Sequence, residues 1–130
     1  MTEPNTHPKI DRRLCGEPVS LAEGKATTKL TATPEMAVDD EGLVHGGFVF
    51  GLVDHAAMLA VNDPMVVLGS AEVRFTAPVR VGDQVVATAA ETEQKGKKRV
   101  LQVSAEVGGT RVLEGTMTAF VLDRHVLAGR

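Results

Sequence analysis

The stretch that decides the fold is Gly42–Asp54, with the sequence GLVHGGFVFGLVD. From Phe48 to Val61 nearly every residue is Phe, Val, Leu, Ala, Met or Gly, which predicts a long helix that is apolar on all sides and buried. Asp54 is the one acidic residue within it. A desolvated carboxylate must find a partner or raise its pKa, so Asp54 is unusual enough to be a candidate functional residue.

The predicted helix start at Gly46 and Gly47 offers a second functional feature. The first N–H groups of a helix have no intrahelical partner and lie at the positive end of the helix dipole. Two glycines there would let a substrate carbonyl approach the backbone closely. An oxyanion hole at Gly46 and Gly47, combined with an acidic group at Asp54, indicates acyl-transfer chemistry.

Spacing along the helix predicts that such a site is shared between two chains. Gly46 and Asp54 are eight residues apart, which is about 12 Å at roughly 1.5 Å per residue. Both groups cannot reach one carbonyl carbon, where contacts must be about 3 Å. Two helices packed antiparallel across a two-fold axis would place Asp54 of one chain beside Gly46 of the other.

Residues 39–47, DDEGLVHGG, with Asp54 nine residues after His45, resemble the core motif of the PaaI-type hotdog acyl-CoA thioesterases. The family pattern is Asn-x-x-Gly-x-x-His-Gly-Gly, followed by an acidic residue nine positions after the His. The resemblance covers roughly residues 17 to 122. It implies an α+β hotdog fold, in which an antiparallel β-sheet wraps around one long central helix. This chain departs from the pattern at Asp39, where members often carry Asn.

The resemblance also implies roles for individual residues. Gly46 would polarise the thioester carbonyl, assisted by Gly47, and Asp54 of the partner subunit would act as general base or nucleophile. Asp39 and Ser70 lie where relatives bind the substrate or assist the attacking water, although a negative charge at Asp39 would repel a carboxylate base. We expect His45 to order the loop by hydrogen bonding rather than to act as a base.

Composition excludes several other classes of function. The net charge is −3, with four Phe and no Trp or Tyr, which argues against nucleic-acid binding. Four His and a single Cys show no metal-ligand spacing, so we expect no metal. Residues 1–8 lack an apolar signal-peptide core, and Asp54 with the stop at Asn62-Asp63-Pro64 argues against a membrane span. Cys15 cannot form an internal disulfide, which favours the cytoplasm.

The remaining residues predict one domain, residues 17–130, preceded by a polar arm, residues 1–16. Alternating apolar and polar residues predict a strand over 18–33, with Ala26, Thr28, Leu30 and Ala32 on one face. After the helix we expect four strands in a meander, over about 66–77, 84–93, 99–107 and 111–122. We expect Phe48, Phe50 and Phe75 in the core, with the lining of an acyl pocket as the alternative for one of them.

Two functions follow from these observations. The first is a thioesterase that hydrolyses an acyl-CoA thioester to free acid and coenzyme A, with no cofactor besides the coenzyme A of its substrate. The alternative is a non-catalytic hotdog module that binds acyl-CoA as a sensor or carrier. In either case we expect a homodimer, which could pair further into a dimer of dimers, because a sheet edge and an apolar helix need covering.

Overall fold

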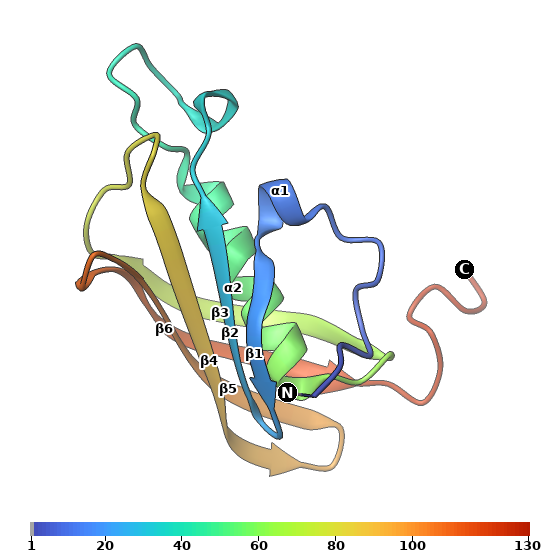
Figure 1. Cartoon of the computed structure of the whole chain (residues 1–130). Helices are drawn as coiled ribbons and strands as arrows, with labels where there is room; N and C mark the ends of the chain where they lie inside the picture. The colour runs from blue at the N-terminus through green and yellow to red at the C-terminus, as the bar shows by residue number, and fades with distance from the viewer. Residues whose placement is uncertain (1) are drawn as a thin grey trace.

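The computed structural model describes residues 2–130; Met1, the first residue of the predicted arm, lies outside this range. Figure 1 shows one long helix lying against a strongly curved sheet. In chain order the elements are α1 (Arg12–Cys15), β1 (Glu17–Ala22), β2 (Lys25–Thr31), the 3₁₀ turn η1 (Pro34–Met36), α2 (Gly46–Val61), β3 (Val66–Phe75), β4 (Gln84–Lys95), β5 (Lys98–Val107) and β6 (Thr110–Val121).

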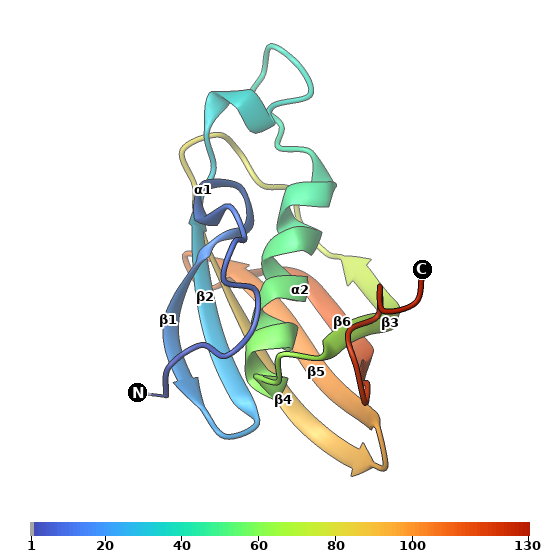
Figure 2. The same cartoon turned by 90° about the vertical axis from the view of Figure 1, so that its right-hand side faces the viewer.

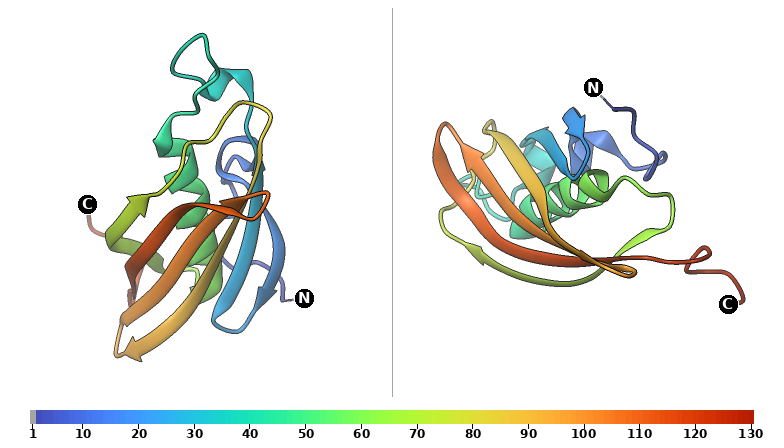
Figure 3. Two further views of the ribbon diagram at one scale, coloured as in Figure 1. Left: turned by 90° about the vertical axis from the view of Figure 1, so that its left-hand side faces the viewer. Right: turned by 90° about the horizontal axis from the view of Figure 1, so that it is seen from below.

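The sheet has six antiparallel strands in the order β1-β2-β4-β5-β6-β3. Seen from below, it bends around α2, and the last residues of the chain project away from it (Figure 3). The predicted α+β arrangement, an antiparallel sheet around one helix, is confirmed. β1 and β3 form the two edges of the sheet, and the Thr2 N–H donates to the carbonyl of Leu21 in β1 (3.2 Å).

Two predictions about the strands were wrong. Residues 18–33 form a hairpin and not a single strand, because Gly24 adopts a positive φ of 74° and turns the chain between β1 and β2. The four later strands are not a simple meander, since β3 pairs with β6 at the sheet edge and β4 pairs with β2. The predicted buried face of β2 is confirmed, with Thr28 fully buried.

The core lies between α2 and the concave face of the sheet (Figure 2). Leu52, Val53, Ala56 and Ala57 of α2 have no exposed surface. The helix ends at Asn62, which takes the left-handed conformation (φ 55°) while its N–H donates to the carbonyl of Met58. No helix within residues 2–130 has the length and apolar character that crossing a membrane requires.

The N-terminal segment packs along α2. The Asn62 side chain accepts a hydrogen bond from the Asn5 N–H (2.7 Å) and donates one to the carbonyl of Glu3 (3.0 Å). His7 stacks on His55 with ring centroids 6.2 Å apart, and the His55 Nδ1 lies 3.3 Å from the carbonyl oxygen of Cys15 in α1. This segment therefore follows the side of α2 that includes the neighbour of Asp54.

Candidate active site

The helix start is positioned by the loop that precedes it. The His45 N–H donates to the carbonyl of Met36 (2.9 Å), and the Val44 N–H donates to that of Val79 (2.9 Å). These bonds hold the chain where α2 begins at Gly46, with His45 as the N-terminal cap residue. No backbone bond outside the elements uses the N–H of Gly46 or Gly47 within residues 2–130. Both groups are thus available to a ligand oxygen.

Two aromatic rings occupy the places where side chains at these glycines would lie. A Cβ at Gly46 would be 3.3 Å from the Phe75 ring, and a Cβ at Gly47 would be 2.9 Å from the His45 ring. Neither glycine has a positive φ, so glycine is needed here for space and not for backbone conformation. The His45 ring also contacts Phe48 edge-on, and it makes no hydrogen bond that caps α2. His45 therefore orders the helix start by packing and through its backbone.

Asp54 is the most perturbed carboxylate in the described chain. Burial raises its pKa from 3.8 to about 6. Its Oδ1 atom is buried and has no hydrogen-bond partner among residues 2–130. A buried carboxylate oxygen without a donor is costly, which makes this atom a place where a second chain, a water or a substrate would bind.

The face of α2 between the helix start and Asp54 is open. Gly47, Gly51 and Asp54 lie one turn apart on one side of the helix, at spacings of four and three residues. A Cβ added at Gly51 would meet no atom within 4 Å. Asp54 and Gly46 remain about 12 Å apart along the axis at 1.5 Å per residue, so a single chain does not bring them together.

Asp39 lies at the tip of the loop before the helix. Ala37 pairs with Val44 across this loop, so Asp39 lies in the turn that this bridge closes. Residues 37–44 form the loop at the top of Figure 1. Its Oδ1 accepts hydrogen bonds from the N–H groups of Glu41 (3.0 Å) and Leu43 (3.2 Å). The carboxylate also lines a groove of about 440 Å³ between the loop and residues 78–83. An Asn side chain could accept the same two bonds, so the turn tolerates either residue.

Ser70 lies on the edge strand β3, where it is exposed. It pairs with Thr118 next to an irregularity in the β3–β6 register between Leu68 and Ser70. Neighbouring Ala71 and Glu72 are also exposed, so this stretch of the edge is uncovered in the single chain.

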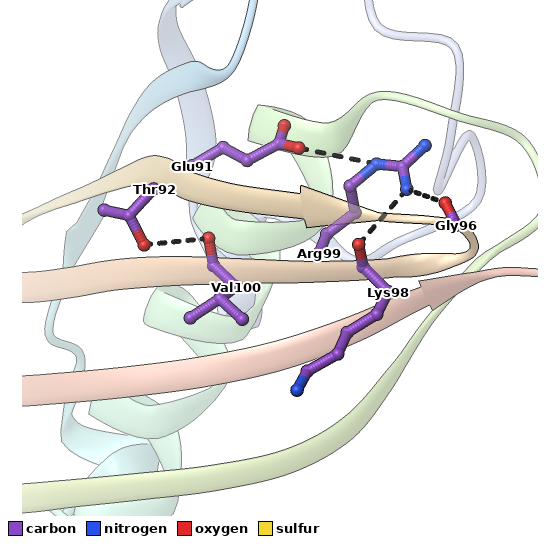
Figure 4. Close-up of polar contacts among 6 residues, drawn as sticks. All are labelled: Glu91, Thr92, Gly96, Lys98, Arg99 and Val100. Atoms are coloured by element: carbon purple, nitrogen blue, oxygen red, sulfur yellow. Dashed lines mark hydrogen bonds and ion pairs between the residues drawn. The ribbon is translucent and has the colours of Figure 1, made fainter.

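Lys95-Gly96-Lys97-Lys98-Arg99 form a basic run at the β4–β5 turn, and this run is only partly available to an anion. Figure 4 shows Arg99 turned toward Glu91, whose Oε1 lies 3.4 Å from Arg99 Nε. The Nη1 of Arg99 donates a hydrogen bond to the carbonyl of Gly96 (2.7 Å). Lys97 pairs with Asp123 at 2.8 Å. Within residues 2–130, no group of three His, Cys, Asp or Glu side chains could hold a metal ion.

Sequence reasoning named Phe75 but did not place it at the helix start. Phe75 was expected in the core, yet 54% of it is exposed and its ring lies against Gly46. The alternation of residues 71–75 predicts that Val73 and Phe75 lie on the same face of the strand. Val73 packs against the core, but the strand extends beyond the core, so Phe75 is exposed. A single sequence does not show where along a strand the core ends. Only the β3–β6 pairing, with Phe75 opposite Leu113, brings the ring to the helix start.

Comparison with known proteins identifies the family. The family described as "Thioesterase superfamily" matches residues 41–114, which is more than half of the chain. The chain belongs to the thioesterase superfamily. Its fold is the hotdog fold, as predicted.

Solved structures of other proteins support this assignment. An uncharacterized protein of Pyrococcus horikoshii is 52% identical, with 97% of each chain covered and a TM-score of 0.95. A variant of the phenylacetic acid degradation protein PaaI from Thermus thermophilus is 29% identical, with 84% of this chain and 95% of that chain covered and a TM-score of 0.76. The predicted resemblance to PaaI-type proteins of the superfamily is confirmed.

Curated relatives of this superfamily member have mixed names. A methylthioribose-1-phosphate isomerase of Aquifex aeolicus is 47% identical over 119 residues, covering 91% of this chain and 26% of the relative. A transcription factor FapR of Shouchella clausii is 34% identical over 107 residues, covering 81% of this chain and 56% of the relative. The chain thus spans about a quarter of the length of the isomerase and about half of the length of the transcription factor.

Proposed function

We propose that the chain is an acyl-CoA thioesterase, which hydrolyses an acyl-CoA thioester to free acid and coenzyme A. Water attacks the thioester carbonyl, the Gly46 N–H with its neighbour at Gly47 stabilises the oxyanion, and the C–S bond breaks as the tetrahedral intermediate collapses. Asp54 of a second copy takes the proton from water and returns it to the departing thiolate. Direct attack by the Asp54 carboxylate is the other route open to the same residue.

The proposal rests mainly on the properties of Asp54. A carboxylate with a pKa near 6 is ionised at neutral pH and is a stronger base than an ordinary Asp, as general-base catalysis near pH 7 requires. Its buried Oδ1 has no partner within the described chain, so it is free to bind the attacking water. A carboxylate that served only the fold would be expected to have its own donor.

A homodimer completes the site in this proposal. The 12 Å separation along one helix requires Gly46 and Asp54 to come from different copies. The open face at Gly51 and the exposed edge of β3 offer surfaces where the second copy can pack. In this arrangement Asp39, His45 and Ser70 bind the substrate or its water, and the reaction needs no cofactor beyond the coenzyme A of the substrate.

A second function remains open, in which the chain binds acyl-CoA without hydrolysing it. The transcription factors FapR among the relatives favour it, since a regulator needs a ligand-responsive module and not turnover. The unpartnered carboxylate at Asp54 favours the enzyme over the sensor. Release of free thiol from a series of acyl-CoA substrates separates the two functions.

Mixing two inactive variants tests the shared site. Asp54→Ala removes the acid, and Gly46→Val places a side chain against the Phe75 ring and over the helix start. Gly46 has no positive φ, so valine is allowed by the backbone there. With random exchange, about half of the dimers are mixed, and each mixed dimer regains one intact site.

The result has a clear control. Each variant alone should be folded by circular dichroism and nearly inactive, and activity should return only after subunit exchange. If both variants fold and exchange yet no activity returns, the assignment of Gly46 and Asp54 to one shared site is wrong.

A further inference from the structure

We infer that Phe75 selects the acyl group of the substrate, by favouring bulky apolar acyl groups over small ones at the helix start. This inference rests on the proposed use of Gly46 as the oxyanion donor. Phe75 would be a specificity-determining residue and not a catalytic one, because its ring contacts the acyl group and exchanges no proton.

The position of the ring relative to Gly46 is the first observation. A Cβ at Gly46 would lie 3.3 Å from Phe75 Cε1 and 3.7 Å from both Cδ1 and Cζ. In a helix every Cα–Cβ bond tilts toward the N-terminus, the end at which the first N–H groups also point. The ring therefore borders the space in which an oxygen bound to the Gly46 N–H must lie.

Distances then decide what the ring touches. A carbonyl oxygen accepting from the Gly46 N–H lies about 3 Å from that nitrogen, and its carbon lies a bond length further out. The two substituents of that carbon are the acyl chain and the sulfur. In our inference the acyl chain is the substituent that lies against the ring, which borders the Gly46 position.

The exposure of Phe75 is the second, independent observation. The residue is 54% exposed, although Val73 on the same face of β3 packs against the core. Its backbone is held in place, since Phe75 pairs with Leu113 and the next N–H, of Thr76, donates to the carbonyl of Val112 (2.9 Å). The single chain leaves a large ring partly exposed on a rigid strand end beside Gly46, and in the proposed dimer this apolar surface is the part that the acyl group covers.

The apolar, aromatic character of the exposed Phe75 ring indicates the class of acyl group that it would bind. An aromatic or branched acyl group stacks on or packs against the ring and buries apolar area, whereas an acetyl group covers little of it. One methylene more or less in a hydrophobic pocket changes selectivity by about 10- to 200-fold. The ring should therefore raise kcat/KM for benzoyl-CoA and hexanoyl-CoA more than for acetyl-CoA.

The test compares Phe75→Ala and Phe75→Leu with the wild type and with Val126→Ala as the matched control. Val126 is equally exposed, at 56%, but lies in the segment after β6, away from the helix start. We expect Phe75→Ala to lower the ratio of kcat/KM for benzoyl-CoA over acetyl-CoA by at least about tenfold. Phe75→Leu should keep the preference for hexanoyl-CoA and lose that for benzoyl-CoA, and Val126→Ala should change neither.

Binding of non-hydrolysable thioether analogues, measured by calorimetry on the same variants, separates this inference from the proposed function. If thioesters are hydrolysed but Phe75→Ala lowers kcat/KM equally for all acyl groups, the selectivity role is overturned and the enzyme assignment stands. If nothing is hydrolysed while the analogues bind with a preference that depends on Phe75, the selectivity role stands and the enzyme assignment is wrong. If the chain neither hydrolyses the thioesters nor binds the analogues, both are wrong.

Discussion

Replacing Asp54 by Asn should make the protein more stable at pH 8 while removing its activity. Burial raises the pKa of this carboxyl from 3.8 to about 6, a shift of about 2 pH units. Because the folded state holds its proton more tightly, stability is highest below pH 3.8 and falls as the pH rises through 6. At 1.36 kcal/mol per unit the full penalty at pH 8 is about 3 kcal/mol, or about 1–3 kcal/mol once partial exposure of the side chain is allowed for.

The amide of Asp54→Asn has the same shape and no charge, so it should lack this penalty. Guanidinium unfolding at one fixed protein concentration should show the variant and the wild type within about 1 kcal/mol of each other at pH 4. The difference should grow to about 1–3 kcal/mol in favour of the variant at pH 8. In the same preparation, kcat should fall by at least about 100-fold, the low end of acid–base assistance.

Two results would refute this reasoning. An equal stability difference at pH 4 and pH 8 would show that Asp54 is not desolvated in the folded protein. Wild-type turnover in Asp54→Asn would remove the residue from the chemistry. Glu23→Gln, at an exposed turn, is the matched control and should change neither stability nor rate.

Further predictions follow from single contacts. If Asp54 acts as the base, wild-type kcat/KM should fall as the pH drops through about 6, and a profile flat from pH 5 to 7 would contradict this. Cys15→Ser should leave turnover unchanged, since burial raises the pKa of the thiol and keeps it protonated; a large loss would indicate cysteine chemistry. Burial lowers the pKa of His7, so the folded protein loses stability as the pH falls below 6.5. His7→Asn removes this ionisable group, and Asn tolerates the φ of 57° at this position. The variant should therefore lose less stability than the wild type between pH 7 and 5. Gly16→Ala should lower the free energy of unfolding by more than about 1 kcal/mol, because φ is 89° and a Cβ would overlap Leu52. Gly51→Ala should leave the thermal unfolding of the isolated fold unchanged, because a Cβ there meets no atom within 4 Å.

The central helix could be predicted well from the sequence because its signals are local. The nearly all-apolar run and the stop at Asn62-Asp63-Pro64 are contained within about twenty residues, and the helix spans Gly46–Val61 as expected. The buried face of β2 was also correct, since alternation is a local pattern. The chain turn at Gly24 was missed, although the buried positions change from odd-numbered Leu21 to even-numbered Ala26 across it.

The pairing of the strands and the ring at the helix start could not be predicted in this way. Placing β3 beside β6 depends on contacts between residues far apart in the sequence, such as Ser70 with Thr118. The packing of Phe75 on Gly46 depends on that pairing, so it could not be predicted from the sequence either. Residues of the proposed site that are close in sequence, His45 with Gly46 and Gly47, could be grouped from the motif alone. Their relation to Asp54 of another chain stays a prediction that the single chain leaves open.

The link between Asn62 and the first residues of the chain has a consequence for measurements of motion. Asn62 closes the last turn of α2 and, through its side chain, also holds Glu3 and Asn5. If the N-terminal segment left the helix, both side-chain hydrogen bonds of Asn62, the residue that caps α2, would break. Amide hydrogen exchange should reveal this coupling: removing residues 2–10 should speed exchange in the last turn of α2 and, through the lost His7–His55 stack, at the residue next to Asp54. A tag or binding partner that displaces this segment would thus act on the helix from the end opposite Gly46.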